Sequence, residues 1–191
     1  MQRRLGVLAL WGVLAVLAGC ASIRPAQVLP ASNASISAFS LNGRVAFKLD
    51  ERGGKAGLRW RHSTTSDSLK LLSPIGTMVG EIEADGDGAT LTTADKKVYR
   101  SNDVQSLTRE VLGWDLPLAG LRYWVIGRAE PGAPVQAQSR DDRQRLQSLT
   151  QNDWRIDYIE YFGDSAMPAR LSLAYDGLNL RLIVDRWELP E

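Results

Sequence analysis

The chain has 191 residues, of which 44% are hydrophobic and 24% charged, and its formal net charge at pH 7 is +1. This length fits one domain with a sizeable core. The balanced charge argues against a nucleic-acid-binding protein and gives no overall electrostatic attraction to anionic lipid. Because Cys20 is the only cysteine, an internal disulfide is excluded.

The N-terminus has the order of a secretory signal peptide. Arg3 and Arg4 precede an apolar run over residues 5–17, which closes on the sequence Leu17-Ala18-Gly19-Cys20. The run is shorter than the ~20 residues of a membrane-spanning helix, so we expect residues 1–19 to be removed. The ending resembles the lipobox of bacterial lipoproteins, in which the cysteine carries diacylglycerol and becomes the first residue. An ordinary secreted protein with an incidental cysteine is the alternative.

The lipobox resemblance also implies a location. Ala21 and Ser22 follow Cys20, and the absence of Asp at the first of these positions is associated in enteric lipoproteins with passage to the outer membrane. Several acyl chains on one cysteine exceed what stable anchoring requires. We therefore expect an outer-membrane protein that is lipid-anchored through Cys20 and faces the periplasm.

The mature chain begins with a tether and continues into a β-rich domain. Residues 20–38 contain prolines and scattered small polar residues with little apolar periodicity, which predicts a flexible lipidated N-terminus. A single domain is expected over 39–191. Its first part alternates with period two, and we expect strands over 41–49, 55–61, 69–73, 78–84 and 89–100.

Two short helices interrupt the strands. Apolar residues recur at helical spacing over 104–112, with Asp103 before them and Gly113 after, and a second helical piece is expected over 118–126. Many antiparallel strands around short helices predict a curved sheet or partly closed barrel with helices against its concave side. The later strand patterns cover 146–151, 154–161, 169–175 and 178–187.

The residues give no support for an enzyme. His62 is the only histidine and lies in a polar turn, so a solvated turn residue is favoured over a catalytic base. The glycines near Gly53 and Gly86 lack the Lys and Ser/Thr of a phosphate loop. Asp85 and Asp87 lack the later Glu of a calcium loop, which favours a turn. We expect no catalytic residues, no metal and no cofactor.

The tryptophans are more informative than the titratable residues. Trp11 falls in the signal peptide, and the others stand at positions 60, 114, 124, 154 and 187. They can fill an ordinary core or line a wide cavity that receives hydrocarbon. Pattern alone favours the core.

A series of short motifs covers nearly all of the mature chain. They are Phe39-Ser40-Leu41-Asn42-Gly43-Arg44-Val45-Ala46, Leu71-Leu72-Ser73-Pro74-Ile75-Gly76, Leu116-Pro117-Leu118, Gly120-Leu121-Arg122-Tyr123-Trp124-Val125-Ile126-Gly127, the strand from Trp154, Met167-Pro168-Ala169, and 180–187. In this order, and with the lipobox, they resemble the LolB family, the outer-membrane receptors of the bacterial lipoprotein-sorting pathway.

The resemblance implies a mainly β fold, an open, incomplete antiparallel β-barrel with a lid of short α-helices around a hydrophobic cavity. Such a protein takes the acyl chains of a lipoprotein from the periplasmic carrier LolA and places them in the outer membrane. The tryptophan argument then shifts towards a cavity. The candidate cavity and lid residues are Val45, Phe47, Leu58, Trp60, Val104, Leu107, Val111, Leu112, Trp124 and Trp154.

The family also carries an exposed apolar residue at the tip of a Pro-x-Gly loop, used to put lipid into the bilayer. Here the loop is Pro74-Ile75-Gly76, with Ile in place of the family's Leu. Without the family, Ile75 would be an ordinary surface aliphatic residue. The implied partners are a LolA-like carrier, acylated lipoprotein cargo and outer-membrane lipid, and we expect a monomer.

Two other functions stay open at this point. An envelope-assembly scaffold would use the same sheet as a protein-binding surface without a lipid cavity. A lipocalin-like protein would bind small apolar ligands without exchange with a carrier.

Overall fold

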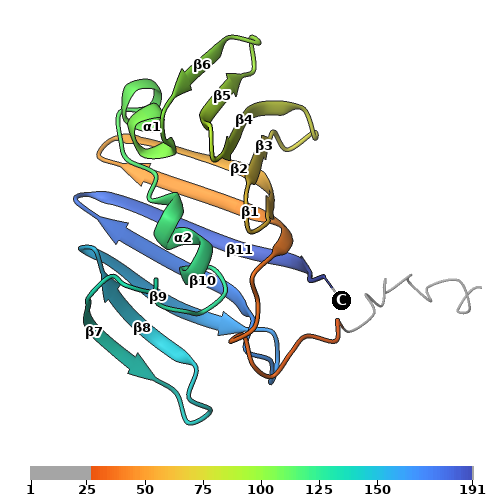
Figure 1. The fold of residues 1–191 in the computed structure, drawn as a ribbon, viewed down its shortest axis with the longest axis vertical. Coiled ribbons are helices and arrows are strands. Elements are labelled where there is room, and N and C mark those ends of the chain that lie inside the picture. Colours follow the sequence, from red (N-terminus) through yellow and green to blue (C-terminus); the bar gives the residue numbers. More distant parts are fainter. Residues whose placement is uncertain (1–26, 191) are drawn as a thin grey trace, which may run out of the picture.

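The computed structural model describes residues 27–190 (Figure 1). The signal peptide over 1–19 and Cys20 lie outside the described residues. The first half of the domain contains strands β1 (Phe39–Leu49), β2 (Arg52–His62), β3 (Asp67–Leu72), β4 (Met78–Asp85), β5 (Gly88–Thr93) and β6 (Val98–Ser101). Helices α1 (Val104–Leu112) and α2 (Leu118–Trp124) follow. The second half contains β7 (Val135–Arg140), β8 (Leu146–Gln151), β9 (Trp154–Tyr161), β10 (Pro168–Tyr175) and β11 (Leu178–Glu188).

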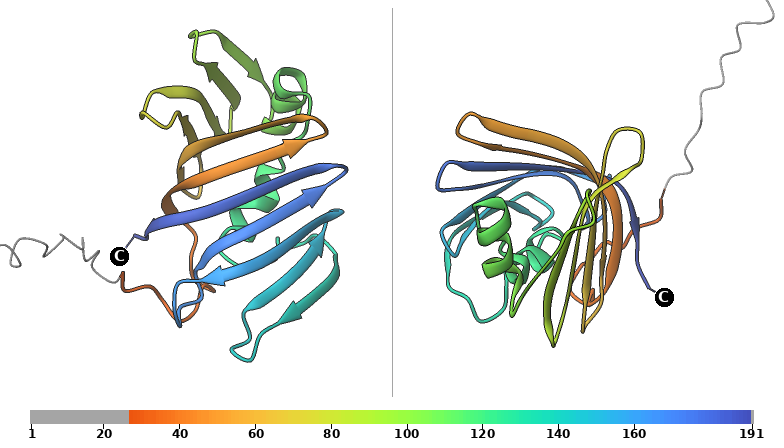
Figure 2. Two further views of the ribbon diagram at one scale, coloured as in Figure 1. Left: turned by 180° about the vertical axis from the view of Figure 1, so that it is seen from behind. Right: turned by 90° about the horizontal axis from the view of Figure 1, so that it is seen from above.

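All of these strands belong to one 11-stranded antiparallel sheet, in the order β6-β5-β4-β3-β2-β1-β11-β10-β9-β8-β7. The first strand pairs with the last at its centre, so two meanders are joined side by side. Because β6 and β7 lie at opposite edges of this order, the sheet stays open. It curves strongly, and both helices lie in its concave side (Figure 2, right). The predicted open, mainly β fold is therefore confirmed.

A β-bulge between Asn42 and Gly43 marks the central pairing of β1 with β11. A Cβ atom at Gly43 would lie 2.3 Å from the carbonyl oxygen of Ile183. Only glycine lets the two backbones approach this closely without a shift. The residue therefore helps to join the two halves of the sheet.

Two strand predictions differ from the structure. The expected strand over 89–100 is divided into β5 and β6 by a tight turn, in which the Lys96 N–H donates to the Thr93 carbonyl at 2.9 Å and Lys96 has a φ of 64°. Strand β7 was not predicted. All six of its residues are exposed and mostly polar, so the edge strand has no alternation to reveal it.

The caps of α1 agree with the sequence prediction. The Asp103 side chain accepts a hydrogen bond from the Ser106 N–H at 2.8 Å, and Gly113 ends the helix with a φ of 81°. The buried Thr108 hydroxyl accepts from the Leu116 N–H at 2.9 Å, which ties the chain after α1 back onto the helix. Helix α2 ends at Trp124, two residues before the predicted end.

The segment before β1 contacts the domain from residue 27 onwards. The Asn33 side chain donates to the carbonyl of Ile126 at 2.6 Å, and the Ala166 N–H donates to the Pro30 carbonyl at 2.9 Å. Arg128 donates to the Ile36 carbonyl at 3.1 Å. The described part of the expected tether is therefore bound to the folded body, and a tether before residue 27 stays a prediction.

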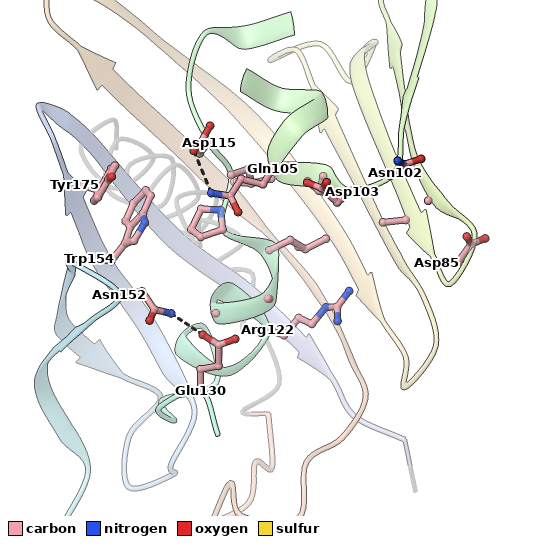
Figure 3. A pocket seen from close by; sticks show the side chains of 18 residues that line it. Asp85, Asn102, Asp103, Gln105, Asp115, Arg122, Glu130, Asn152, Trp154 and Tyr175 are labelled. Atoms are coloured by element: carbon pink, nitrogen blue, oxygen red, sulfur yellow. Dashed lines mark hydrogen bonds between the residues drawn. The ribbon is translucent and has the colours of Figure 1, made fainter. Parts of the chain in front are cut away.

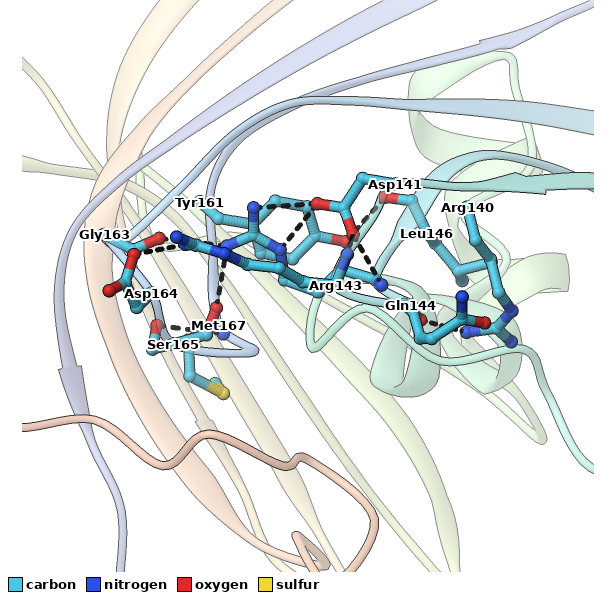
Figure 4. A network of polar contacts seen from close by, with 11 residues as sticks. Arg140, Asp141, Arg143, Gln144, Leu146, Tyr161, Gly163, Asp164, Ser165 and Met167 are labelled. Atoms are coloured by element: carbon cyan, nitrogen blue, oxygen red, sulfur yellow. Dashed lines mark hydrogen bonds and ion pairs between the residues drawn. The ribbon is translucent and has the colours of Figure 1, made fainter.

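A polar network ties the β7–β8 turn to the β9–β10 connection (Figure 4). Asp141 accepts from the backbone N–H groups of Arg143 and Arg145, each at 2.9 Å, and from Arg145 Nε at 2.8 Å. The Arg145 guanidinium donates to the carbonyls of Gly163 and Ser165 and lies 4.3 Å from the centre of the Tyr161 ring. Arg145 thus links two loops that lie at the same end of neighbouring strands.

Candidate ligand cavity

An apolar cavity of about 260 Å³ lies between the concave side of the sheet and the helices. It draws on both halves of the sheet. Strands β1 to β5 supply Val45, Phe47, Leu58, Trp60, Leu69, Leu71, Val79, Gly80, Glu81, Ile82, Leu91 and Thr93, and β10 and β11 supply Leu173, Leu180 and Leu182. The lid side supplies Leu112, Trp114, Leu116, Leu121 and Val125. Glu81 is the single charged residue in this lining, and its carboxylate pairs with Lys70 at 2.8 Å on the other side of the sheet.

The cavity has an apolar mouth. Phe47, Val79 and Leu112 all line it, yet each exposes about two fifths of its surface to solvent, at 39%, 40% and 38%. Exposed aliphatic residues scattered singly need no explanation, whereas three around one opening form a patch. The opening therefore lies between the β1–β2 hairpin, β4 and the end of α1.

The loop that carries Ile75 is ordered by its own hydrogen bonds. The Ser73 N–H donates to the Thr77 carbonyl at 2.8 Å, and the Gly76 N–H donates to the Ser73 carbonyl at 2.9 Å. Gly76 has a φ of 83°, which favours glycine. Ile75 is 89% exposed at the tip, and the loop, yellow in Figure 2, stands out from the sheet.

The structure distributes the candidate cavity and lid residues over three environments. Val45, Phe47, Leu58, Trp60 and Leu112 line the apolar cavity. Val104 and Trp154 line a separate pocket, Leu107 and Trp124 are fully buried in the core, and Val111 packs partly buried against it. The sequence reasoning missed Trp114 and the contributions of β4, β10 and β11, although the alternation of Leu180 and Leu182 in β11 is a signal that could have found them.

The separate pocket has about 500 Å³ and a mixed polar and apolar lining (Figure 3). Its acidic side chains have structural partners. Hydrogen bonds from the Ser106 N–H and hydroxyl lower the pKa of Asp103, the cap of α1. Arg109 and Gln105 bind Asp115, and the bond from Arg109 lowers the pKa of that carboxyl. These groups hold the lid helices in place.

The tryptophans serve both purposes that the sequence left open. Trp60 and Trp114 line the cavity. The other three lie against the core, where Trp124 donates to the Gln151 side chain at 2.9 Å and Trp187 donates to the Pro168 carbonyl at 3.0 Å. Trp154 stacks on Tyr175 with ring centres 5.2 Å apart.

The prediction that His62 is a solvated turn residue is wrong. Its side chain is only 13% exposed, and Nδ1 lies 3.0 Å from Asp67 Oδ1. Asp67 is buried at the start of β3 and also accepts from Trp60 Nε1 at 2.8 Å. Its other oxygen lies 2.7 Å from Arg122 Nη2 on α2. The carboxylate therefore connects the sheet to a lid helix.

Residues 27–190 contain no group of three or more His, Cys, Asp or Glu side chains placed to hold a metal ion. Of the helices in that range, none is long and apolar enough to cross a membrane.

The fold and the cavity define the class of the protein, an open antiparallel β-barrel with a helical lid over an internal apolar cavity. Comparisons with known proteins specify it further. The family model described as outer membrane lipoprotein LolB matches residues 37–187, so the chain belongs to the LolB family. The family's members are named for the outer membrane, and the chain is accordingly a lipid-anchored protein of that membrane.

Individual relatives agree with the family match. The outer-membrane lipoprotein LolB of Nitrosomonas europaea is 34% identical, over 93% of this chain and 90% of its own. The LolB of Thiobacillus denitrificans is also 34% identical, over 98% of both chains. Among solved structures, a DUF1329 family protein from Desulfovibrio piger has a TM-score of 0.50 at 6% identity, covering 82% of this chain and 87% of its own. That last likeness concerns the fold alone.

Proposed function

We propose that the chain accepts acylated lipoproteins from a LolA-like periplasmic carrier and inserts them into the outer membrane, holding their acyl chains in the cavity. The observation that carries the proposal is an almost wholly apolar cavity that opens through the exposed side chains of Phe47, Val79 and Leu112. Hydrocarbon gains free energy there in proportion to the apolar surface it removes from water. Family membership supports the same role.

The size of the cavity implies that the lid moves. At about 260 Å³ it is smaller than the ~300–1,000 Å³ of typical ligand pockets, so several acyl chains need more room. Helix α1 contacts the edge strand β6, which pairs only with β5, and it contacts β5 itself. Acyl chains that bind the wider form would shift the population towards an open lid. The direction of transfer comes from differences in affinity for the cargo between the carrier, this chain and the bilayer. Each ~1.4 kcal/mol of difference shifts the partition of the cargo tenfold.

The loop with Ile75 has a separate task in this proposal. Burying one such side chain in lipid is worth ~1.5–3 kcal/mol, enough for a reversible contact with the bilayer and too little for anchoring. Anchoring belongs to the lipid on Cys20, and Pro74 and Gly76 shape the loop that presents Ile75. Delivery of cargo would therefore depend on Ile75, while acceptance would not.

The transfer is tested with the mature chain carrying Cys20→Ala, mixed with carrier loaded with a labelled lipoprotein and then with liposomes. We expect label to move to this chain and onward. Ile75→Glu is expected to accept label at the wild-type level and to deliver it poorly. Val28→Glu is the matched control, because Val28 is 98% exposed outside the loop, and it is expected to behave as wild type. If label never leaves the carrier, transfer is the wrong function and a scaffold role replaces it.

A lid test separates transfer from the lipocalin-like alternative. Leu112→Asp places a charge at the mouth, where the side chain is 38% exposed and the fold tolerates it, and is expected to reduce uptake of an apolar fluorescent probe and of cargo together. Glu110→Lys, on an exposed position of the same helix, is the control. Unchanged uptake in Leu112→Asp would contradict the cavity. Uptake of free probe without exchange with the carrier would favour the lipocalin-like function.

A further inference from the structure

The outer face of the sheet carries a cationic groove that the cavity does not use. It has about 780 Å³ and crosses β1, β2, β9, β10 and β11 near the β1–β2 turn. Small side chains, among them Ala46, Ser172 and Ala174, form its floor. Its cationic residues are Lys48, Arg52, Lys55, Arg155 and Arg181.

Strand register gathers the cations around one point. Ala46 lies opposite Lys55 on β2 and opposite Arg181 on β11, and Lys48 is two residues further along β1. Alternate residues of β1, including Phe47, face the cavity, so Ala46 and Lys48 point to the outer side. Three exposed cations from three neighbouring strands therefore surround the small side chain of Ala46.

Four of the five groove cations have no ion-pair partner among residues 27–190, whereas several other cations of the sheet do. Arg44 pairs with Asp185 at 2.8 Å, and Lys70 pairs with Glu81 at 2.8 Å. Within the groove, Arg155 pairs with Asp157 at 3.0 Å and Glu51 is the remaining acid. Within the described part of the chain, Lys48, Arg52, Lys55 and Arg181 have no carboxylate at ion-pair distance. The balanced overall charge thus conceals a local excess of positive charge.

The groove lies close to the loop that the proposed function directs at the membrane. Leu72, the last residue of β3, pairs with Gly57, two residues from Lys55. The yellow loop in Figure 2 projects beside the orange β1 and β2 strands, on their outer side. A surface that met the groove could therefore also meet Ile75.

We infer that the groove docks the phosphate headgroups of anionic phospholipids at the bilayer surface and so orients the Ile75 loop for insertion. The inference rests on the proposed function and adds the lipid class that the chain recognises. Unpaired Lys and Arg side chains are attracted to an anionic leaflet, and a short apolar tip beside them supplies the second contact that stable peripheral binding needs. The lipid on Cys20 fixes the chain to the membrane, and the groove fixes which face it presents.

The test uses the mature chain with Cys20→Ala and sedimentation with vesicles of phosphatidylcholine alone or mixed with phosphatidylglycerol. We expect phosphatidylglycerol to strengthen binding about tenfold or more, and added salt to reverse the gain. The triple variant Lys48→Glu, Lys55→Glu, Arg181→Glu is expected to lose the gain in binding that phosphatidylglycerol gives. The control Arg100→Glu, Arg140→Glu, Arg143→Glu changes the net charge equally at exposed positions outside the groove and is expected to keep it.

A second readout separates this inference from the proposed function. Uptake of an apolar probe by the cavity is expected to be equal in the wild type and both triple variants, which also shows that they are folded. If the wild type takes up no probe, the cavity fails while the groove can still stand. If binding ignores phosphatidylglycerol, or the groove variant keeps the gain, the inference is wrong. A groove variant that binds vesicles normally but no longer binds the carrier would make the groove a protein-docking surface.

Discussion

At the scale of single residues, Asp67 has the most demanding environment in the domain. Its side chain is 0% exposed. The carboxylate accepts a hydrogen bond from Trp60 and contacts His62 and, on the lid helix α2, Arg122. A buried carboxylate needs such partners because desolvation otherwise disfavours its charge. The Arg122 side chain is 35% exposed, so in the ion pair that joins α2 to the sheet only Asp67 is fully buried.

Asp67→Asn is therefore expected to destabilise the domain by about 1–3 kcal/mol, less than for a wholly buried pair because Arg122 retains access to water. The measurement is urea unfolding, and hydrogen exchange of α2 should speed up. Asp185→Asn is the matched control, since the Arg44–Asp185 pair is exposed at 63% and 37% and its loss is expected to cost under about 0.5 kcal/mol. Equal stability of the two variants would contradict the role of Asp67 as the link to the lid.

Sequence reasoning could not find this cluster. His62 and Asp67 flank a polar turn, and nothing in the local pattern shows that the turn folds against α2. Arg122 lies 55 positions beyond Asp67 in the sequence, within a motif that indicates the family but no contact with Asp67. The burial of a charge depends on its distant neighbours, whereas the burial of Leu58 or Trp60 follows from the period-two alternation of their own strand.

At the scale of elements, the sequence predicted those whose two faces differ. Strands β9 and β11 alternate between buried and more exposed residues over most of their length, as do the start of β1 and the second half of β2. Helix α1 has an N-cap and a C-terminal glycine. Strand β7 has no buried face, so its pairing with β8 leaves no trace in the pattern. The turn between β5 and β6 depends on a positive φ at Lys96. Lysine rarely adopts a positive φ, so the sequence does not predict this turn.

The loop network at the β7–β8 turn gives a pH prediction. Burial would raise the pKa of Asp141, but hydrogen bonds from Arg145 and Arg143 outweigh it and hold the pKa below the ordinary 3.8. A carboxyl whose pKa is lower in the folded state adds stability above its unfolded pKa, and that stability is lost as pH falls through the folded value. We expect the free energy of unfolding to fall between roughly pH 5 and pH 3, and to fall less steeply in Asp141→Asn.

Urea unfolding at several pH values measures this dependence. Asp164→Asn serves as the control, because Asp164 pairs with Arg143 at the same turn while its side chain is 86% exposed. The control is expected to keep the wild-type slope. If the free energy of unfolding of Asp141→Asn falls with pH as steeply as that of the wild type, the loss of stability in acid comes from other groups.

At the scale of the whole molecule, the cavity arises from the pairing of the first strand with the last. Val45 of β1 lies opposite Leu182 of β11, and both line the cavity. Local periodicity predicts which side chain of each strand points inward, but the meeting of two meanders is a long-range event that periodicity does not encode. The fold class therefore followed from the sequence, whereas the share of β10 and β11 in the cavity did not.

Because the lining comes from both halves of the sheet, an apolar ligand in the cavity is expected to stabilise the whole domain. A ligand that binds only the folded state, at a free concentration about 100 times its dissociation constant, adds about 2.7 kcal/mol. For a domain of this size the unfolding midpoint should rise by roughly 5–10 °C. Thermal unfolding of the Cys20→Ala chain with and without a long-chain fatty acid measures the rise.

Two variants show whether the effect belongs to the cavity. Phe47→Asp places a charge at the mouth, where the side chain is already 39% exposed, and is expected to lose most of the ligand-induced rise while it still folds. Ile159→Asp changes an apolar residue that is 55% exposed outside the cavity lining and is expected to keep the rise. Equal rises in both variants would mean that the fatty acid binds elsewhere on the surface, because a charge desolvated beside hydrocarbon must weaken binding at the mouth.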